Sequence, residues 1–219
     1  MIHGKVLIED LDSTCLGSWK PIKIIGEGLG GTVLEVCNLS SCDYIAKIPT
    51  GYFASKEEVY FLEDVKELNV TPKLIEVIEC DYQHQDIPVI IMEKYDGDIS
   101  SLLSLTYELK NIFAQAFNII WLLLQNNIIH NDTRVENFVY KYDENKDDYT
   151  VKIIDFGIAK ELSRTKLSIN EAMKKQLERF VNSIIYFPSY NKNIDNKRKE
   201  VLIELIDEII TKNPEWLNK

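Results

Sequence analysis

The pattern of apolar residues changes near residue 95, and this change limits the folds open to the chain. Before it, short runs such as KPIKIIG, TVLEVCN and IPVIIMEK are rich in apolar and β-branched residues, with Gly, Asn, Ser or Pro between them. Such runs predict β-strands. After it, residues 99–125 contain the apolar stretch IFAQAFNIIWLLL, which indicates a helix. We therefore expect an α+β fold with a strand-rich first part and a mostly helical second part.

Each part contains an exception to its dominant pattern. The segment SKEEVYFLEDVKEL interrupts the strands and predicts a helix, because Val59, Leu62, Val65 and Leu68 recur at helical spacing. In the second part, FVYKY and VKIID flank the polar DENKDD and predict a hairpin. Two amphipathic helices should follow. Their apolar faces comprise Ile169, Ala172, Met173, Leu177, Phe180, Val181 and Ile184 in the first, and Val201, Leu202, Leu205, Ile206, Ile209 and Ile210 in the second.

Charge and hydropathy restrict the partners of the chain. The net charge of −10 argues against broad attraction to nucleic acid or anionic membranes, which carry the same sign. The longest strongly apolar run, Ile119–Leu124, is far shorter than the ~18 residues of a transmembrane helix. The first residues also lack the apolar core of a secretory signal. We expect no nucleic-acid partner, no membrane span and a cytoplasmic location, in the host cytoplasm if this is a viral or secreted effector protein.

Four cysteines bear on the same question of location: Cys15, Cys37, Cys42 and Cys80. The pair in CNLSSC could be bridged across a hairpin, or could bind a metal ion with two further ligands. The histidines form no metal-binding pattern with the cysteines, so reduced thiols are the favoured interpretation. Reduced thiols fit a cytosolic protein.

A glycine-rich stretch lies between two of the predicted strands. Gly26, Gly28 and Gly31 form a G-x-G-x-x-G pattern within IGEGLGGTVLEV. Glycine also serves any tight turn, so the pattern alone is weak. A dinucleotide-binding fingerprint requires a helix directly after the glycines, whereas Thr32 and Val33 lead into a strand. The order strand, glycine loop, strand predicts a hairpin whose backbone can approach phosphate groups closely.

Lys47 lies in the apolar strand of YIAKIP, where a lysine is costly unless it reaches solvent or an anion. It could simply occupy an edge strand. A carboxylate on the following helix would be its partner, and we favour Glu58 because that helix then buries its apolar face. Glu57 and Glu63 are alternatives. Ser55 and Glu58 could instead form a capping box that serves only the start of the helix.

The stretch IIHNDTRVEN adds a third motif, because His130, Asp132 and Asn137 form H-x-D-x-x-x-x-N. The run VKIIDFG then places D-F-G at Asp155. Taken in order, the glycine loop, strand lysine, helix glutamate, H-x-D-x-x-x-x-N and D-F-G resemble the protein kinase superfamily. The resemblance covers roughly residues 20–160. Each motif is common by itself, but the ordered set is highly specific.

The resemblance implies a single bilobal kinase-like domain over residues 1–219. Its N-lobe would span about 1–93, its hinge 94–97 and its C-lobe 98–219. Residues 158–219 are all that follow D-F-G, and no A-P-E motif is found. The C-lobe is therefore expected to be reduced, as in compact or atypical kinases.

The resemblance also implies that ATP and Mg²⁺ are bound. In this family the lysine of the third strand holds the α- and β-phosphates and pairs with a helix glutamate. Ala46 would cover the adenine, which the Glu93 carbonyl and the Tyr95 amide would contact. The residues implied in nucleotide binding are Gly26, Gly28, Gly31, Val33, Ala46, Lys47, Glu93 and Tyr95.

Phosphoryl transfer needs alignment and charge compensation more than covalent help. By resemblance, Asp132 accepts or orients the proton of the substrate hydroxyl, while Asn137 and Asp155 hold Mg²⁺. Arg134 stands where a lysine aimed at the γ-phosphate is usual in Ser/Thr kinases, and it keeps the charge but not the geometry. His130 is expected to brace the loop.

The chain departs from the family pattern at Asn131, which replaces the arginine of H-R-D. That arginine normally pairs with a phosphate on the activation loop, so we expect activity that is constitutive or controlled by a partner. The predicted function is ATP-dependent phosphoryl transfer to protein Ser/Thr hydroxyls, with a protein substrate and a regulatory protein as partners. A kinase-fold scaffold and a small-molecule phosphotransferase are the alternatives.

Overall fold

The computed structural model describes residues 13–28, 30–49, 52–82, 85–104, 109–186 and 196–217, without the side chains of 13, 14, 52–55, 81, 82 and 85. The chain divides into two compact units, described separately below. The first unit comprises Met1–Lys94 and Asp155–Ile158, and the second comprises Tyr95–Ile154 and Ala159–Lys219. The short D-F-G segment therefore belongs with the first unit, although it follows sixty residues of the second in the chain.

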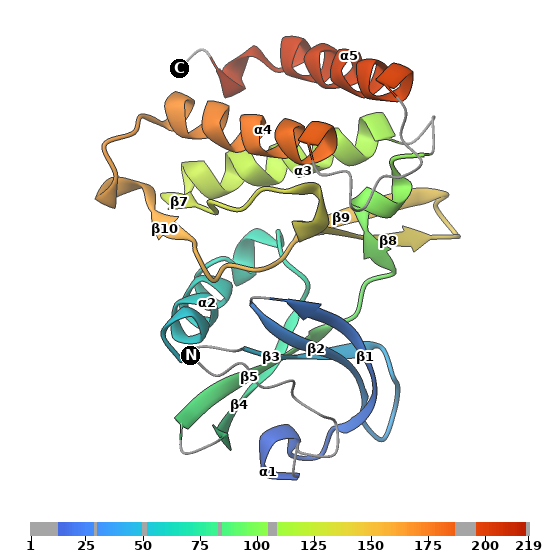
Figure 1. Cartoon of the computed structure of the whole chain (residues 1–219), viewed down its shortest axis with the longest axis vertical. Helices are drawn as coiled ribbons and strands as arrows, with labels where there is room; N and C mark the ends of the chain where they lie inside the picture. The colour runs from blue at the N-terminus through green and yellow to red at the C-terminus, as the bar shows by residue number, and fades with distance from the viewer. Residues whose placement is uncertain are drawn as a thin grey trace. The chain divides into compact units, whose positions relative to one another are not determined.

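The first unit contains the strand-rich part that the sequence predicts (Figure 1). Its five-stranded sheet is antiparallel throughout. The strands follow one another across the sheet in the order β1 (Lys20–Gly28), β2 (Gly31–Cys37), β3 (Tyr44–Ile48), β5 (Gln85–Glu93) and β4 (Leu74–Tyr82). Because β1 and β2 are neighbours, the glycine loop connects the two strands of a hairpin.

The two faces of this sheet have different partners, because successive side chains of a strand point to opposite sides. One face forms the apolar core of the unit, which includes Leu34, Val36, Ala46, Ile48, Val89 and Ile91 together with Leu16 of α1 (Ser13–Leu16) and Trp19. On the other face, Val33, Lys47 and Ile90 are cross-strand neighbours. Lys47 is thus directed away from the apolar core.

The predicted helix between β3 and β4 forms as α2 (Tyr52–Asp64), and a short 3₁₀ turn, η2 (Lys66–Leu68), follows it. Phe61, Leu62 and Val65 are buried. The polarity pattern therefore located the helix correctly but extended it past its end, since Leu68 lies in the 3₁₀ turn.

The expectation of reduced thiols is wrong in this structure, which pairs all four cysteines. Cys37 and Cys42 are joined across the turn between β2 and β3, with Cα atoms 4.0 Å apart. Cys15 of α1 is joined to Cys80 of β4, with Cα atoms 4.5 Å apart and a sequence separation of 65. These Cα–Cα distances lie near the short end of the range that is usual for disulfides.

The second unit is mainly helical, as expected, and α3 (Leu109–Gln125), α4 (Ile169–Tyr186) and α5 (Asn196–Lys212) pack together in it (Figure 1). Phe113 and Phe117 of α3 meet the ring of Phe180 of α4 edge-on, at centroid distances of 5.2 and 5.0 Å. These aromatic contacts form the centre of the core of this unit. The predicted helix over residues 99–125 begins too early, because Ile99–Leu102 form the 3₁₀ turn η3.

The second unit also contains several short strands. The predicted hairpin is β8 (Phe138–Asp143) and β9 (Asp148–Ile153), joined at one edge by β6 (Gly97–Asp98). A separate pair consists of β7 (Ile128–Ile129) and β10 (Lys160–Glu161). No helix in the described part of the chain is long and apolar enough to cross a membrane.

Candidate active site

In the first unit, Lys47 holds two carboxylates at once. Its Nζ donates to Glu58 Oε1 at 2.6 Å and to Asp155 Oδ1 at 2.9 Å. The side chains of Lys47 and Glu58 are 10% and 3% exposed, whereas that of Asp155 is 35% exposed. The structure therefore pairs Lys47 with Glu58 rather than with its rivals: Glu57 is exposed and Glu63 pairs with Lys66. The capping alternative involves the Ser55 side chain, which lies outside the described residues.

The protonation of this cluster follows from burial and from the neighbouring charges. Burial would lower the pKa of Lys47, but the charges of Glu58 and Asp155 outweigh it and raise that pKa above its ordinary value. Lys47 therefore stays protonated. Burial raises the pKa of Glu58, and the ammonium of Lys47 opposes this shift only in part. The cluster is thus held together by one buried cation between two acids.

The D-F-G segment is tied to α2 as well as to Lys47. Asp155 adopts a left-handed backbone conformation with φ of 68°, which turns the chain directly after β9. Phe156 is fully buried and stacks on Phe61 of α2 at a centroid distance of 6.5 Å. The backbone of Phe156 also hydrogen-bonds the Glu58 carboxylate. Strand β3, helix α2 and D-F-G are therefore locked together inside the first unit.

The positions in the loop differ in whether, and for what physical reason, they require glycine. Gly31 has φ of 137°, and a Cβ there would lie 2.2 Å from the carbonyl oxygen of Ile48, so this position requires glycine for the fold itself. A Cβ at Gly28 would meet no described atom within 4 Å, and one at Gly26 would make only ordinary contacts. A Cβ at Gly30 would lie 3.4 Å from Asp155 Oδ2, so the loop backbone passes close to that carboxylate.

The assignment of Ala46 to the adenine site is wrong. Ala46 is fully buried in the apolar core with Leu34 and Ile91, on the face of the sheet opposite Lys47. Strand alternation places Ile45, two residues before Lys47, on the lysine side, and Ile45 is half-buried there. In the family pattern V-A-I-K the alanine likewise stands two positions before the lysine, so a one-residue misalignment caused the error.

The remaining nucleotide-site predictions are divided between the two units. Val33 is half-buried beside Lys47 on the neighbouring strand. Glu93 ends β5, and its backbone N–H donates to Lys73 O at 3.0 Å. Tyr95 begins the second unit, where Lys141 Nζ lies 5.8 Å from its ring centroid. Whether the Glu93 carbonyl and the Tyr95 amide bind adenine stays a prediction.

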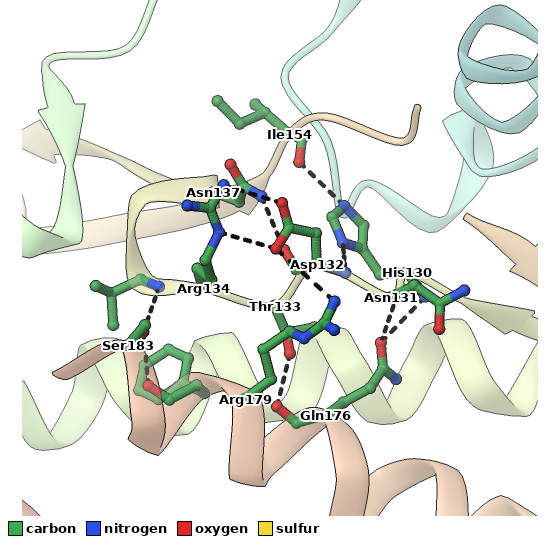
Figure 2. A network of polar contacts seen from close by, with 12 residues as sticks. His130, Asn131, Asp132, Thr133, Arg134, Asn137, Ile154, Gln176, Arg179 and Ser183 are labelled. Carbon is green, nitrogen blue, oxygen red and sulfur yellow. Dashed lines mark hydrogen bonds and ion pairs between the residues drawn. The ribbon is translucent and has the colours of Figure 1, made fainter. Parts of the chain in front are cut away.

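In the second unit, Asp132 is surrounded by arginines (Figure 2). Arg134 binds it with a fork: Nε donates to Oδ1 at 2.9 Å and Nη2 to Oδ2 at 3.1 Å. Arg179 of α4 extends toward the same carboxylate, with Nη1 4.0 Å from Oδ1. The Asp132 side chain is 18% exposed. The proposed base is therefore partly accessible and lies beside two positive charges.

The loop that carries Asp132 is braced from within. His130 is fully buried, its Nε2 lies 3.0 Å from Ile154 O, and its Nδ1 accepts from the Asp132 N–H at 3.3 Å. Asn137 Nδ2 donates to Asp132 O at 2.8 Å, which leaves the amide oxygen of Asn137 as its acceptor atom. His130 thus serves as the brace that the sequence predicted, and Asn137 adds a second one.

Helix α4 supplies anchors that sequence reasoning missed (Figure 2). Gln176 Oε1 accepts from the N–H groups of His130 and Asn131 at 3.0 and 3.3 Å, and Gln176 O accepts from Thr133 Oγ1 at 2.6 Å. Ser183 Oγ accepts from Val135 N at 3.0 Å. Gln176 and Ser183 are buried polar residues on the apolar face of an amphipathic helix. A polar residue at each of these two apolar-face positions is the signal in the sequence that could have identified the anchors.

Each unit supplies one oxygen donor of the kind that Mg²⁺ prefers when it binds together with nucleotides. The described residues contain no group of three or more His, Cys, Asp or Glu side chains suited to a metal ion. Mg²⁺ in phosphotransferases typically uses one or two protein ligands together with substrate phosphates and water. Asp155 supplies a partly exposed carboxylate beside the glycine loop, and Asn137 supplies an amide oxygen. Both are hard oxygen donors of the type that Mg²⁺ prefers.

Comparison with known proteins finds similarity to protein kinases. Calcium-dependent protein kinase 4 of Plasmodium berghei (strain Anka) is 26% identical over 159 residues, covering 68% of this chain and 30% of that protein. Cyclin-dependent kinase F-3 of Oryza sativa subsp. japonica is 26% identical over 154 residues, covering 66% and 34%. The chain thus spans about a third of the length of these relatives. The family model for the protein kinase domain matches residues 19–189, and the chain belongs to that family.

Proposed function

We propose that this protein transfers the terminal phosphoryl group of ATP, with Mg²⁺, to Ser or Thr hydroxyls of a protein substrate. The observation that carries the proposal is Lys47, which contacts Glu58 and Asp155 simultaneously. Protein kinases require this lysine–glutamate ion pair and the metal-binding aspartate of D-F-G to be in place together. Membership of the kinase domain family supports the same reaction.

In the proposed reaction the acceptor oxygen attacks the terminal phosphorus, and the bond from that phosphorus to the bridging oxygen of ADP breaks. Asp132 orients the hydroxyl and takes its proton, and ADP leaves with the bridging oxygen. Lys47 binds the α- and β-phosphates, and the backbone at Gly28, which no packing contact requires to be glycine, approaches them. Mg²⁺ held by Asp155 and Asn137 would neutralise phosphate charge. Arg134 supplies positive charge beside the base.

Independence from activation-loop phosphorylation is part of the proposal. The Lys47–Glu58 pair is already formed without a phosphate. The segment after D-F-G is short and is tied to the rest of the second unit, because β10 pairs with β7 and Ser163 N donates to Asn127 Oδ1 at 2.8 Å. Asn131, at the position of the phosphate-sensing arginine, has φ of 64°, a left-handed conformation that asparagine tolerates better than arginine does.

The compartment and the partners are also proposals. A cytoplasmic location was predicted from the lack of a secretory signal and from reduced thiols. The two disulfides weigh against it because disulfides persist mainly in oxidising compartments. Alkylation of the thiols in protein isolated from its source cell, followed by mass measurement, tests the location. Four alkylated cysteines would favour the cytoplasm, and none would favour an oxidising compartment. A regulatory protein partner is proposed because no phosphate-dependent switch is evident in the described segment.

The test of the function is transfer of labelled phosphate from Mg-ATP to proteins of a cell lysate and to the chain itself. Wild type should label Ser or Thr, identified by peptide mapping. Asp132→Asn and Asp155→Ala should lose labelling at least a hundredfold while keeping the wild-type circular dichroism spectrum. Equal labelling by wild type and Asp155→Ala would refute the proposal.

A scaffold function is the second candidate, because Arg134 engages both oxygens of Asp132 in this structure. The fork occupies one lone pair on each carboxylate oxygen, so a substrate hydroxyl would have to compete with Arg134 for this base. A scaffold would transfer no phosphate, and wild type and Asp155→Ala would capture the same partner equally. Labelling of small hydroxylated molecules but not of proteins would instead indicate a small-molecule phosphotransferase.

A further inference from the structure

A cavity of about 600 Å³ adjoins Asp132 within the second unit. Helix α4 forms most of its lining. The residues that matter here are Asp132, Arg134, Lys175, Glu178, Arg179 and Ser183. Ser183 is buried in this lining, and its hydroxyl accepts from Val135 N and donates to Phe180 O. The charged side chains around the cavity, rather than its hydroxyl, are therefore the groups able to recognise a ligand.

The charges around this cavity differ in sign from the protein as a whole. The fork between Arg134 and Asp132 offsets one positive charge against one negative charge. Lys175 and Arg179 then outnumber Glu178, whereas the whole chain carries −10. Both Lys175 and Arg179 are exposed. A local positive region on an acidic protein attracts anionic ligands to one place and repels them elsewhere.

The spacing of these two cations matches an extended peptide. Lys175 and Arg179 are four residues apart on α4, so they lie on the same face, separated by about 6 Å along the helix axis. In an extended peptide, alternate side chains point the same way and repeat about every 6.7 Å. Two acidic residues at alternate positions of a substrate could therefore each meet one cation.

We propose that this cavity binds an acidic segment of the protein substrate, with Lys175 and Arg179 contacting Asp or Glu side chains near the Ser or Thr that reaches Asp132. The proposal rests on the proposed kinase function, because it deepens the specificity of the same site. Arg179 has two roles in it: its guanidinium lies 4.0 Å from Asp132, and half of its side chain remains exposed toward a ligand. Lys175 lies one helical turn from Glu171 and interacts with it electrostatically, and in this proposal it also contacts the substrate.

Binding is measured without requiring catalysis. A fluorescein-labelled peptide with one Ser flanked by Glu at alternate positions is titrated with the full chain, and its anisotropy is followed. A Gln-for-Glu peptide is the neutral comparison. We expect the acidic peptide to bind roughly tenfold more tightly than the neutral one, and the preference to shrink as salt is raised. Lys175→Glu and Arg179→Glu should each weaken binding of the acidic peptide about tenfold.

Lys174→Glu is the matched control, because Lys174 is the exposed neighbour of Lys175 and makes the same charge change outside the cavity lining. It should alter acidic-peptide binding less than twofold, with circular dichroism verifying the fold of each variant. The double variant Lys175→Glu/Arg179→Glu should bind a Lys-for-Glu peptide more tightly than wild type does, which a merely unfolded protein would not do. Equal effects of Lys174→Glu and Lys175→Glu would overturn the proposal.

A parallel transfer assay with the same peptides separates this proposal from the function itself. Preference for the acidic peptide in binding, with no phosphate transferred to any peptide, refutes the kinase function and leaves the binding site standing. Transfer to acidic and neutral peptides at equal rates, unchanged by Lys175→Glu, refutes the binding site and leaves the function standing. A raised KM for ATP in Lys175→Glu without any change in peptide binding would assign the cations to the nucleotide and also refute the proposal.

Discussion

Lys47→Met should destabilise the first unit as well as abolish transfer. The substitution removes the ammonium that lies 2.6 Å from Glu58 Oε1 and 2.9 Å from Asp155 Oδ1. Asp155 is 35% exposed and can be rehydrated, but Glu58 is 3% exposed and would keep an unpaired buried charge. Removing one partner of a buried ion pair costs about 3–5 kcal/mol. We expect the free energy of unfolding to fall by about 3 kcal/mol at pH 7.

The pH dependence of this loss has a definite sign. Burial raises the pKa of Glu58 above its ordinary value of 4.5, and Lys47 opposes that shift. Without Lys47 the pKa of Glu58 in the folded state rises further. A carboxyl with a raised folded pKa favours folding below its unfolded pKa, and that contribution is lost as pH rises through the folded pKa. The deficit of Lys47→Met should therefore be larger at pH 7 than at pH 5.

Two further variants make the reasoning refutable. Lys47→Met/Glu58→Gln removes both charges and should recover about 2 kcal/mol of the loss, because replacing a whole buried pair costs far less than breaking it. Lys66→Met breaks the exposed pair with Glu63 and should change stability by less than about 0.5 kcal/mol. Urea unfolding followed by circular dichroism measures all of them, and amide exchange in β3 and α2 locates the effect. A double variant less stable than Lys47→Met would disprove the account.

Other variants test neighbouring features, each by urea unfolding and by transfer assay. Gly31→Ala should lower the free energy of unfolding by roughly 2–4 kcal/mol, because Gly31 has a positive φ and an added Cβ would contact the backbone of Ile48. Gly28→Val should keep its stability and raise the KM for ATP. Equal losses of stability in the two variants would refute this distinction. Cys15→Ser should lower the free energy of unfolding by about 4 kcal/mol and Cys37→Ser by about 2 kcal/mol, because the Cys15–Cys80 disulfide closes a far longer loop. A larger loss for Cys37→Ser than for Cys15→Ser would contradict the pairing. Asn131→Arg should lower the free energy of unfolding by about 1 kcal/mol, because Asn131 has a left-handed backbone conformation that arginine adopts less easily. It should not activate transfer, and strong activation would show a phosphate-dependent switch.

The sequence predicted best what depends on local pattern. Strands and the amphipathic face of α4 follow from residue spacing within short segments. The choice of Glu58 as the partner of Lys47 used the predicted apolar face of α2 together with the family resemblance. The error at Ala46 is also local, since a strand read one residue out of register exchanges its two faces. The sequence alone could have given the correct residue, because the strand residue on the same face as Lys47 lies two positions away from it.

Tertiary contacts explain what the sequence did not predict. The partners Cys15 and Cys80 are 65 residues apart, and only the packing of α1 on β4 brings them together. Gln176 likewise serves a loop more than forty residues earlier in the chain, so its role needs the helix and the loop to be assembled first. The grouping of Asp155 with the first unit follows from Lys47 and the stacking of Phe156, which no local pattern expresses.

The braces that α4 supplies to the loop of Asp132 are uncharged, and this bears on regulation of the proposed kinase. An amide oxygen of Gln176 holds the N–H groups of His130 and Asn131, and a hydroxyl of Ser183 holds that of Val135. Neither group titrates near neutral pH or binds a phosphate. The charged groups are concentrated instead at Asp132, where they would meet the substrate. The bonds from α4 then fix the loop geometry, whereas binding of the proposed substrate is sensitive to charge. We therefore expect control of the proposed kinase to act through what reaches Asp132 rather than through rearrangement of the loop.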